Sequence, residues 1–393
     1  MAKQRLGERL WSWASDIEPD TLEQAARTAS LPFVQPHLAL MPDAHLGKGA
    51  TVGSVIPTER AIIPAAVGVD IGCGMIAVLT GLERSDLTET VRTGRELRHL
   101  REGIERAVPL SAGSYNTDLT GSAKARVGEL EDLAEVDYDV VAPTWRLQLG
   151  SLGSGNHFIE VTVDERDRVW AFLHSGSRGI GNRLAQRHIA VAQSLCRRWH
   201  ISLPDPDLAY LVEDTDEFDA YLRDLHWAQR FALLNREEMM DRLLDCLSQW
   251  AGRDVGELER INCHHNFTQA EEHFGRRLWV SRKGAIEARE GQPGLIPGSM
   301  GTASYVVVGR GEPVSLCSSP HGAGRRYSRT RARRTFTREQ LREAMSGIEY
   351  RDTDAFLDEI PAAYKDIDQV MADAADLVEV RHVLRQVVNV KGD

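Results

Sequence analysis

The sequence predicts an α+β fold in which residues 1–393 form a single domain. Two observations predict this fold. Short apolar runs are separated by glycine-rich bends, which is typical of strands joined by tight turns. Two longer segments, residues 85–108 and 216–250, place apolar side chains at helical spacing. No break in charge or composition is strong enough to mark a domain boundary.

Composition limits the class of protein. The 393 residues are 42% hydrophobic, which is ample for a large core, and the formal net charge is −11. An acidic chain does not coat nucleic acid uniformly, although a local basic face is compatible with this charge. Five cysteines without a CxxC pair favour a reducing compartment. Since no apolar run approaches the roughly 20 residues of a membrane helix, and residues 1–15 lack a signal-peptide core, we expect a soluble cytoplasmic protein without a membrane partner.

The first part of the chain contains a polar segment and then a glycine-rich one. Residues 1–30 are polar and are expected to be helical in part. Residues 37–58 alternate short apolar stretches with glycines and are interpreted as strand and loop, with Asp43, His45 and Lys48 on the loop. A polar turn explains these three side chains equally well. The loop is a weak phosphate signal, because the Walker A pattern is absent.

A glycine-rich bend at residues 68–75 carries the first chemical signal. The apolar runs 61–67 and 76–79 flank it, so we expect a strand, a tight bend and a second strand. Asp70 and Cys73 lie three residues apart on this bend and form a plausible half of a metal site. The alternative is a buried cysteine that packs as a small hydrophobe beside a turn aspartate.

Residues 85–108 are expected to form one amphipathic helix. Ser85 is a candidate N-cap, and the apolar residues that follow it fall near one face. Residues 111–135, which are rich in Gly, Ser and Asp, indicate a surface excursion.

Two similar segments then bring histidines to strand ends. In residues 147–163 a glycine-rich loop delivers Asn156 and His157 to the start of a strand. In residues 169–182 a strand ends at His174, and a Gly/Ser loop opens a helix. Such a loop offers free backbone N–H groups to an anion, and Arg178 adds a bidentate phosphate donor. A single histidine at either place is often structural.

The next motifs lie beyond the long helical segment. His264 and His265 are adjacent, and on a strand they cannot both face one way, so at most one is a natural metal ligand there. Lys283 follows 18 residues after His265. The small-residue loop at 296–304 precedes a β-rich run and suits close approach to a nucleotide, although an ordinary hairpin is the alternative.

A loop histidine supplies a candidate nucleophile. His321 is followed by Gly322, Ala323, Gly324 and Arg325. Neutral imidazole can attack phosphorus, and the phosphoramidate that forms is labile enough to pass the group on. The arginine-rich run at 325–338 is interpreted as a polyanion-binding strip, with a solvated charged face as the alternative.

The last segments are a helix and a strand. Thr337 and Gln340 form a capping-box pattern for a helix that ends near Gly347. Residues 377–390 alternate like a strand. Lys391 follows, and a lysine in such a place is ordinarily solvated.

Together these residues favour metal-dependent chemistry. Thiolate, imidazole and carboxylate suit a borderline transition metal such as Mn, Fe, Co or Zn. A thiolate can bridge two metals, and two adjacent metals favour in-line phosphoryl transfer. The residues alone therefore indicate a metal-dependent phosphoryl-transfer enzyme.

The motifs as an ordered set are more specific than any one of them. In chain order they are MPDAHLGKGATVGSVIP, GVDIGCGM, LGSGNHFIE, HSGSRGIGN, CHHNF, IPGSMGTASY and HGAGR. This set, from about residue 37 to Lys391, resembles the RtcB family of RNA-splicing ligases. The resemblance implies mixed and antiparallel β-sheets at the core with surrounding helices, in an RtcB-like catalytic domain.

The resemblance also implies an activity. The family joins RNA 3′-phosphate or 2′,3′-cyclic phosphate ends to 5′-hydroxyl ends, in tRNA splicing or RNA repair, with GTP as guanylate donor and two Mn²⁺ ions. An archease-type activator is an expected partner. By resemblance, one metal would be held by Asp70, Cys73 and His157. The second would be held by Cys73, His174 and His265, and His321 would carry GMP.

The remaining implied roles concern the nucleotide and the phosphates. The guanylate would be held by Asn156, His157, Glu160, His265, Pro297, Gly298, Ser299, Met300, Ser304, His321, Gly322, Ala323, Gly324 and Lys391. Phosphates would face Arg178, Lys283 and Arg325, and Asp43 is a weaker candidate near the metal bend. Pro320 departs from the smaller residue expected before His321, and the chain is compact for the family.

Two other classes of function compete with the ligase. A metal-dependent RNA-end phosphoesterase would use the same metal ligands but would not need His321. A noncatalytic RNA-binding relative would keep the arginines and lose metal ligands, whereas every ligand position matches here.

Overall fold

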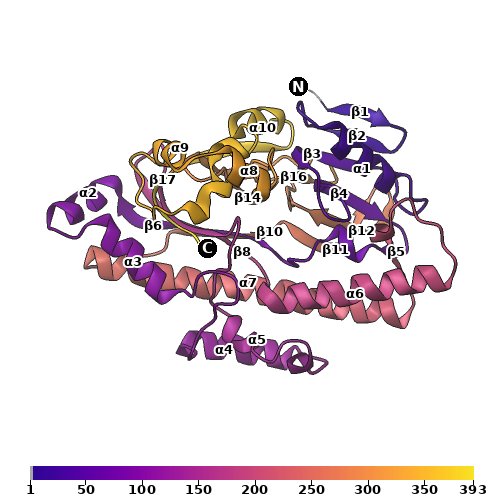
Figure 1. The fold of residues 1–393 in the computed structure, drawn as a ribbon, viewed down its shortest axis with the longest axis horizontal. Coiled ribbons are helices and arrows are strands. Elements are labelled where there is room, and N and C mark those ends of the chain that lie inside the picture. Colours follow the sequence, from indigo (N-terminus) through magenta and orange to yellow (C-terminus); the bar gives the residue numbers. More distant parts are fainter. Residues whose placement is uncertain (1–2) are drawn as a thin grey trace.

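The computed structural model describes residues 3–393 and has two large β-sheets at its centre (Figure 1). The first sheet has the order β1-β2-β3-β4-β12-β11, in which β2 and β3 are parallel and the other neighbours antiparallel. Its strands are β1 Gln4–Gly7, β2 Leu10–Ser12, β3 Leu38–His45, β4 Val52–Thr58, β11 Asn266–His273 and β12 Arg276–Lys283.

The second sheet is antiparallel throughout and has the order β10-β6-β8-β7-β17-β15-β14. Its strands are β6 Gly74–Glu83, β7 Phe158–Val163, β8 Arg168–Ser175, β10 Glu259–His264, β14 Pro293–Ile296, β15 Ser304–Gly309 and β17 Val378–Val390. Two short pairs complete the strands: β5 Ala61–Ile62 with β9 Leu211–Val212, and β13 Ala285–Glu287 with β16 Ser318–Pro320. The predicted mixed and antiparallel sheets are confirmed.

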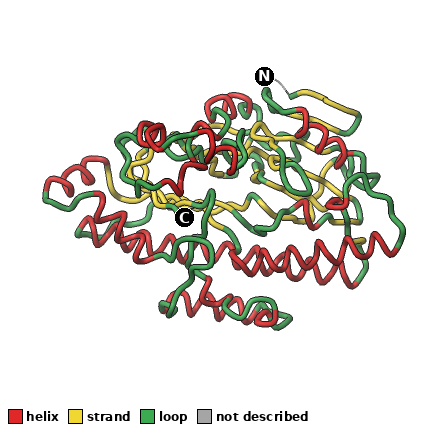
Figure 2. Tube along the Cα trace, in the orientation of Figure 1, coloured by secondary structure: helices red, strands yellow, loops and turns green. Residues whose placement is uncertain are grey.

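Helices lie on both sides of the sheets (Figures 1 and 2). The long helices α6 and α7 run side by side along one face, and α8, α9 and α10 lie on the other. The α-helices are α1 Pro19–Ala29, α2 Arg84–Arg92, α3 Leu97–Ala107, α4 Gly121–Asp132, α5 Trp145–Gln148, α6 Arg178–Arg198, α7 Asp216–Ala251, α8 Arg329–Thr335, α9 Arg338–Ala344 and α10 Ile367–Asp373. None of the helices within residues 3–393 is both long and apolar enough to cross a membrane.

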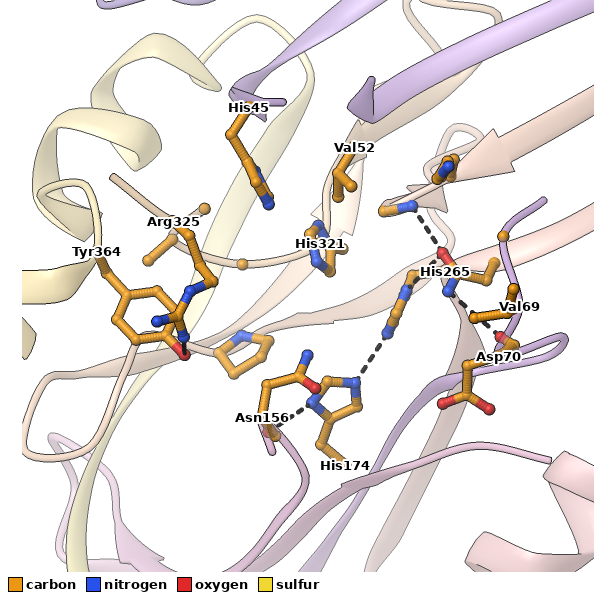
Figure 3. A pocket seen from close by; sticks show the side chains of 18 of the residues that line it. His45, Val52, Val69, Asp70, Asn156, His174, His265, His321, Arg325 and Tyr364 are labelled. Atoms are coloured by element: carbon orange, nitrogen blue, oxygen red, sulfur yellow. Dashed lines mark hydrogen bonds between the residues drawn. The ribbon is translucent and has the colours of Figure 1, made fainter. Parts of the chain in front are cut away.

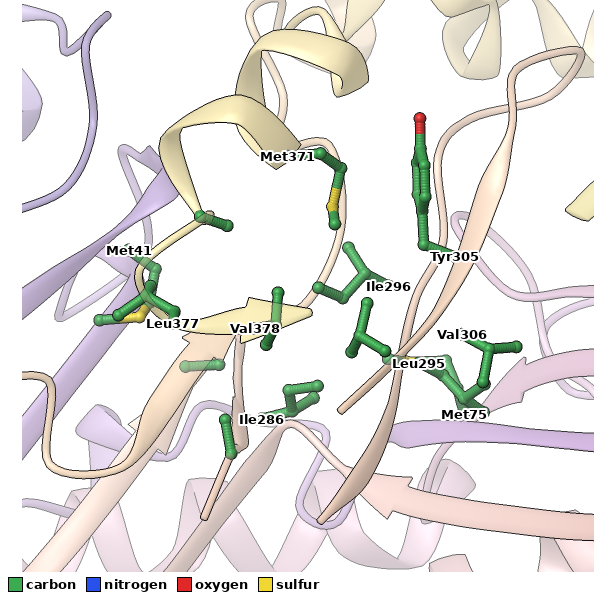
Figure 4. Close-up of a cluster of buried hydrophobic side chains, with 14 of the residues drawn as sticks. Met41, Met75, Ile286, Leu295, Ile296, Tyr305, Val306, Met371, Leu377 and Val378 are labelled. Atoms are coloured by element: carbon green, nitrogen blue, oxygen red, sulfur yellow. The ribbon is translucent and has the colours of Figure 1, made fainter. Parts of the chain in front are cut away.

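The central strands β6, β7 and β8 of the second sheet are largely buried on both faces, and β6 shows how. Met75 and Ala77 face a core shared with the first sheet, whereas Ile76 and Val78 face α7 and α3. Figure 4 shows part of the shared core, where Leu295, Ile296 and Val378 meet side chains from β3 and α10. Because alternate residues point to opposite faces, a strand covered on both sides is apolar at every position.

Two sequence predictions are wrong in detail. The run 61–67 is strand only at Ala61–Ile62, because Pro64 opens a 3₁₀ turn over Pro64–Ala66. The helix expected over 85–108 is divided into α2 and α3. The chain turns at Gly94, which has φ near +90°, and the N-cap of α2 is Glu83 in place of Ser85.

Other expectations are confirmed or modified. The helix expected over 216–250 is α7, the capping box at Thr337 and Gln340 opens α9, and the last predicted strand is β17. The excursion 111–135 contains a helix, α4. The polar segment 1–30 includes β1 and β2 as well as the expected helix, α1.

Candidate active site

A cavity of about 600 Å³ lies where the two sheets, α6 and the loop after β16 converge (Figure 3). Among the residues expected from the sequence, it is lined by Asp70, Asn156, Glu160, His174, His265, Lys283, Pro297, Gly298, Ser299, Met300, Ser304, His321, Gly322, Ala323, Gly324, Arg325 and Lys391. Cys73 and His157 lie at hydrogen-bond distance from lining residues, although they do not themselves line the cavity. The structure therefore gathers segments more than 300 residues apart in the sequence.

Strand register brings the candidate metal ligands together. His174 lies opposite Met75 of β6 and Phe158 of β7, so Cys73 and His157 lie just beyond neighbouring strand ends. His264 ends β10 opposite Gly74, which places His265 beside Cys73. The site follows from ordinary antiparallel pairing, with each ligand at or next to the end of a strand at one edge of the sheet.

The ligand atoms form two groups that share one sulfur atom. Cys73 Sγ lies 3.4 Å from His157 Nε2 and 3.3 Å from His174 Nε2. His174 Nε2 lies 2.8 Å from His265 Nε2, and His157 Nε2 lies 3.1 Å from Asp70 Oδ2. The groups are Asp70–Cys73–His157 and Cys73–His174–His265, and within each the donor atoms are all within 4.8 Å of one another.

The other ring nitrogen of each histidine is held by an oxygen atom. His157 Nδ1 donates to Leu152 O at 2.8 Å, and His174 Nδ1 donates to Asn156 O at 3.2 Å. His265 Nδ1 donates to Asn266 Oδ1 at 3.2 Å. Each proton therefore sits on Nδ1, and each Nε2 presents its lone pair to the centre, as metal-binding histidines usually do.

Two lone pairs that face each other at 2.8 Å repel, and a cation bound by both nitrogens would offset that repulsion. Burial lowers the pKa of both His174 and His265 well below the ordinary value, and neighbouring histidines add to this effect. Both rings are therefore neutral and carry no second proton on Nε2. Burial raises the pKa of Asp70, but the neighbouring His157, the Cys73 thiol and the Arg178 charge together outweigh it and bring that pKa to about 2. The donor set fits divalent ions of the borderline class.

The adjacent histidines face different ways, as their spacing predicts. His265 faces the centre, whereas His264 Nδ1 lies 2.8 Å from Gly72 O and 3.2 Å from Arg236 Nη2. Burial and the Arg236 charge lower the pKa of His264 to about 3, so its ring is neutral. Since it contacts the backbone and an arginine, His264 has a structural position.

His321 is held by a buried aspartate. Its Nδ1 donates to Asp43 Oδ2 at 2.6 Å, and its backbone N–H donates to the same oxygen at 3.2 Å. Asp43 is fully buried within β3, which ends at His45, so the expectation that these two residues lie on a loop is wrong, whereas Lys48 does lie on the loop. The proton on Nδ1 leaves the Nε2 lone pair of His321 free in the cavity. The ring centroids of His321 and His265 are 4.6 Å apart.

The chain around His321 is tightly constrained. Pro320 ends β16 opposite Ala285, and Gly324 follows with φ near +74°. A Cβ atom at Gly324 would lie 2.2 Å from Asp43 O, so only glycine allows the loop to close over β3. The HGAGR run therefore keeps His321 and Asp43 in contact despite the proline.

One end of the cavity presents an unpaired acceptor. Glu160 Oε1 accepts from Asn389 Nδ2 at 2.8 Å, whereas the buried Oε2 has no hydrogen-bond partner. Burial raises the pKa of Glu160 to about 8, against the opposing effects of Lys391 and Asn389. Lys391 is itself buried, with Nζ 3.4 Å from Glu359 Oε2, so its ordinary interpretation as a solvated lysine is wrong.

The three cations expected to face phosphates all contact protein groups. Arg178 donates to Ser151 Oγ at 3.1 Å and lies behind the cavity wall. Lys283 Nζ donates to the carbonyl oxygens of Lys48 and Ala65, and burial lowers its pKa to about 8. Arg325 donates to Asp358 O at 2.7 Å and to Tyr364 Oη at 2.9 Å.

The arginine-rich run carries less free charge than its sequence indicates. Arg325 and Arg329 pair with Glu359, and Arg333 pairs with Asp358. Further along, Arg338 and Arg342 both pair with Asp352. An acidic segment that follows in the sequence folds back on the run, so the interpretation as a continuous polyanion-binding strip is only partly supported.

Several lining residues escaped the sequence analysis because no local motif marks them. Gln186, Ile189, Ala190 and Gln193 line the cavity from one face of α6, and Asp207 lies beside them. Their i, i+3, i+4, i+7 spacing is the only sequence signal, and it is common to many helices.

The chain is similar to known ligases along nearly its whole length. A sequence model described as tRNA-splicing ligase RtcB matches residues 24–392. RNA-splicing ligase RtcB of Escherichia coli (strain K12) is 47% identical, covering 98% of this chain and 97% of that protein. tRNA-splicing ligase RtcB of Pyrobaculum aerophilum is 33% identical, covering 93% and 89%. RNA-splicing ligase RtcB of Mycobacterium bovis is 30% identical, covering 88% and 94%.

Proposed function

Because this chain belongs to the RtcB family of RNA ligases, we propose that it joins RNA 3′-phosphate or 2′,3′-cyclic phosphate ends to 5′-hydroxyl ends, with GTP and Mn²⁺. The observation that carries the proposal is the pairing of His321 with Asp43 beside the clustered ligand atoms. A hydrolase that activates water would need the ligands, but it would not need an imidazole with its Nε2 lone pair held free.

The first step transfers GMP to the protein. His321 Nε2 attacks the α-phosphorus of GTP, a P–N bond forms, and the bond to the β-phosphate oxygen breaks, so that pyrophosphate leaves with the electron pair. Asp43 keeps the Nδ1 proton in place and stabilises the positive charge that develops on the ring.

Two Mn²⁺ ions fit the donor set described above, one on Asp70, Cys73 and His157 and one on Cys73, His174 and His265. When bound, they supply positive charge that offsets the charge of the reacting phosphates. The buried histidines stay neutral and hold their Nε2 lone pairs toward the centre because their Nδ1 protons are committed to oxygen atoms.

The guanylate end of the cavity is defined here by Phe158, Glu160, Asn389 and Lys391. The unpaired Oε2 of Glu160 suits the two N–H donors on the Watson–Crick edge of guanine. Pro297, Gly298, Ser299, Met300 and Ser304 line the same cavity, and the Gly322–Gly324 loop adjoins His321. A base without those donors would leave a buried carboxylate unpaired, which favours GTP over ATP.

The later steps use the RNA ends. Water first opens a cyclic phosphate to a 3′-phosphate. A 3′-phosphate oxygen then attacks the phosphorus of the His321 adduct, the P–N bond breaks, and Nε2 regains its lone pair. Finally the 5′-hydroxyl oxygen attacks the 3′-phosphorus, GMP leaves with the electron pair of the pyrophosphate bond, and the hydroxyl proton passes to solvent.

The proposal extends to the setting of the enzyme. The cavity draws residues from both sheets, which supports a single catalytic domain over residues 1–393. The free Cys73 thiol needs a reducing compartment such as the cytoplasm. Broken or intron-containing tRNA is a suitable substrate class, and an archease-type protein is a suitable activator.

The test is guanylylation without RNA. The purified protein is incubated with α-labelled GTP and Mn²⁺, with and without an archease-type activator, and run on a denaturing gel. We expect an acid-labile GMP–protein adduct in the wild type and in His226→Ala, an exposed histidine on α7. The adduct should be absent from His321→Ala and Cys73→Ala.

The opposite result has a definite meaning. If the wild type forms no adduct even with the activator, the guanylyl-transfer mechanism is wrong. The RNA-end phosphoesterase would then be the better assignment, and release of a 3′-phosphate from a cyclic-phosphate RNA would be measured next.

A further inference from the structure

Two consecutive residues of α7, Asn235 and Arg236, lie behind the ligand cluster, and the steps proposed above do not use them. Both side chains are fully buried, and neither lines the cavity. Within residues 3–393 no carboxylate pairs with the Arg236 guanidinium, and burial lowers its pKa to about 10. A charge buried without a carboxylate is costly, so its contacts indicate a role other than stability. We refer to the two sets of candidate ligands as the aspartate group (Asp70, Cys73 and His157) and the two-histidine group (Cys73, His174 and His265).

The guanidinium of Arg236 contacts three separate segments of the chain. Nη1 donates to Gly72 O at 2.8 Å and to Ser175 O at 3.1 Å. Nε donates to Asn262 Oδ1 at 2.8 Å, and Nη2 lies 3.2 Å from His264 Nδ1. These contacts join the glycine-rich bend, the end of β8 and the end of β10 through one side chain.

Each of these segments carries one ligand of the two-histidine group. The acceptors on the bend and on β8 belong to the residue before Cys73 and the residue after His174, and β10 ends directly before His265. A guanidinium holds several acceptors in a fixed planar geometry, which an ammonium group does not. Without Arg236 the three segments would lose the one side chain that they share.

Asn235 contacts a different pair of segments. Its Oδ1 accepts from the backbone N–H groups of Gly150 at 2.7 Å and Ser151 at 3.2 Å. Its Nδ2 donates to Ser151 O at 3.2 Å, to Ser175 Oγ at 3.3 Å and to Gly176 O at 3.1 Å. The amide therefore ties the glycine-rich loop before β7 to the loop after β8.

The segments that Asn235 ties together hold the aspartate group. Leu152 O, which accepts the Nδ1 proton of His157, lies on the first of them. On the second, Gly176 packs so closely against the Asp70 carboxylate that a Cβ atom would collide with it, and the N–H of Ser177 donates to Asp70 Oδ1 at 3.0 Å. The acceptor for His157 and the donor to Asp70 thus both depend on one amide.

We infer that Arg236 is a positioning residue for the two-histidine group and Asn235 for the aspartate group, so that adjacent residues of one helix each set the geometry of one metal site. The inference rests on the metal part of the function proposed above. Cys73 belongs to both groups, and its N–H also donates to Asp70 O at 3.2 Å within the bend, so it keeps a backbone contact when either side chain is removed. Side chains that orient metal ligands typically contribute about 10- to 100-fold to metal affinity.

The experiment counts metal ions in the absence of GTP and RNA. The apoprotein is titrated with Mn²⁺ by calorimetry, and the wild type is expected to bind two ions. Arg236→Met should weaken one site about 10- to 100-fold, and Asn235→Ala should weaken the other by a similar factor. Arg282→Met removes another fully buried arginine, whose contacts lie outside both groups, and should leave both affinities unchanged.

Second substitutions identify which site each residue serves. His265→Ala leaves only the aspartate group complete, and His157→Ala leaves only the two-histidine group complete. Arg236→Met should therefore leave the remaining site of His265→Ala unchanged and weaken that of His157→Ala. Asn235→Ala should show the reverse pattern, which a general loss of stability cannot produce.

The other outcomes are equally decisive. The inference is overturned if Arg236→Met and Asn235→Ala bind both ions with the wild-type affinities, or if either variant weakens the two sites equally. A wild type that binds no Mn²⁺ refutes the metal part of the proposed function, and the inference with it.

Denaturant unfolding of the apoprotein shows whether each variant folds. If Arg236→Met does not fold, Arg236→Lys supplies the test, because it keeps a buried charge but lacks the planar fork and should weaken the same site. In the same way Asn235→Asp, which keeps the acceptor oxygen and loses the amide donor, replaces Asn235→Ala.

Discussion

At the scale of single residues, the contact between Asp43 and His321 decides the chemistry. An imidazole with its proton held on Nδ1 has an attacking lone pair on Nε2, and this tautomer is set by an acceptor that only a carboxylate or carbonyl provides. A residue that donates in place of Asp43 would reverse the tautomer without changing the fold.

Asp43→Asn is therefore expected to slow guanylylation by about 10²-fold or more. The Asn amide can donate to Nδ1, which shifts the ring proton to Nε2 and removes the attacking lone pair. The rate of adduct formation from labelled GTP measures the effect, and the Kd for GTP should stay near that of the wild type. A variant that guanylylates at the normal rate would show that Asp43 does not set the tautomer.

If Glu160 binds guanine as proposed, the affinity of the protein for GTP should depend on pH. Its pKa of about 8 in the free enzyme means that the carboxylate needed for guanine is largely protonated at neutral pH. Binding should therefore tighten as pH rises, by about tenfold between pH 7 and pH 9. Calorimetric titration with a nonhydrolysable GTP analogue gives the measurement, and Glu160→Gln should bind weakly with little dependence on pH.

The stability of the free protein should change with pH in the opposite direction. Because folding raises the pKa of Glu160, the contribution of this residue to stability falls as pH rises from 4.5 to 8.

The candidate site could be predicted from the sequence where its residues lie in motifs. His157, His174 and His321 lie beside glycine-rich loops, and His265 lies in the adjacent-histidine motif CHHNF, so sequence patterns mark all four. Ala190 and Gln193 could not be identified, because a helix face reveals its role only when another segment closes a cavity against it. The burial of Lys391 could not be predicted from its own segment either, because it depends on contacts with Glu359 and Phe158.

At the scale of elements, a buried ion-pair network fastens β11 and β12 to the loop before β16. Arg282 Nη1 donates to Glu271 Oε1 at 2.5 Å, and Arg282 also donates to Leu316 O at 3.1 Å and to Ser318 Oγ at 2.9 Å. Arg282 is fully buried. This network holds in place β16, the strand that leads into His321.

Removal of the carboxylate leaves the arginine charge buried and unpaired. Glu271→Ala should lower the free energy of unfolding by about 3–5 kcal/mol, whereas Glu23→Ala, which breaks the exposed pair with Arg27, should change it by less than about 0.5 kcal/mol. Denaturant titration measures both. Equal effects for the two variants would contradict a structural role for the network.

The same carboxylate sets an acid limit on stability. Burial raises the pKa of Glu271, but Arg282 and His273 outweigh it and hold that pKa near about 2. Since folding lowers this pKa, the stabilisation is fully present above about pH 4.5 and is lost as pH falls toward 2. The pH dependence of unfolding in that range should be shallower in Glu271→Ala.

The elements themselves could be predicted to the extent that local signals were unambiguous. The long helix α7 matches its prediction almost residue for residue, because Thr215 caps it and Gly252 ends it in the left-handed conformation. The division of α2 from α3 depends on Gly94. This division could not be predicted, because a single glycine is also tolerated within a helix. The resemblance implied mixed and antiparallel sheets but not the order of their strands, since pairing between distant strands leaves no local trace in the sequence.

At the scale of the whole molecule, metal binding and folding are linked. The donor atoms come from segments far apart in the sequence and lie together only in the folded chain, so an ion that binds them should raise the melting temperature. With Mn²⁺ at a hundred times its Kd, each site adds about 2.7 kcal/mol to the free energy of unfolding. Calorimetry should show this shift in the wild type and in Cys263→Ala, a neighbouring cysteine outside both ligand groups. Cys73→Ala should lose it, and an equal shift there would exclude a bridging thiolate.

The position of β17 determines when the second sheet can be completed during translation. β17 lies between β7 and β15, yet it is synthesised after both. Until it emerges, β7 and β15 each present an unpaired edge, which is a template for aggregation. The sheet whose strand ends carry the candidate metal ligands therefore closes late in translation, and until then the exposed strand edges favour binding of a chaperone to the nascent chain.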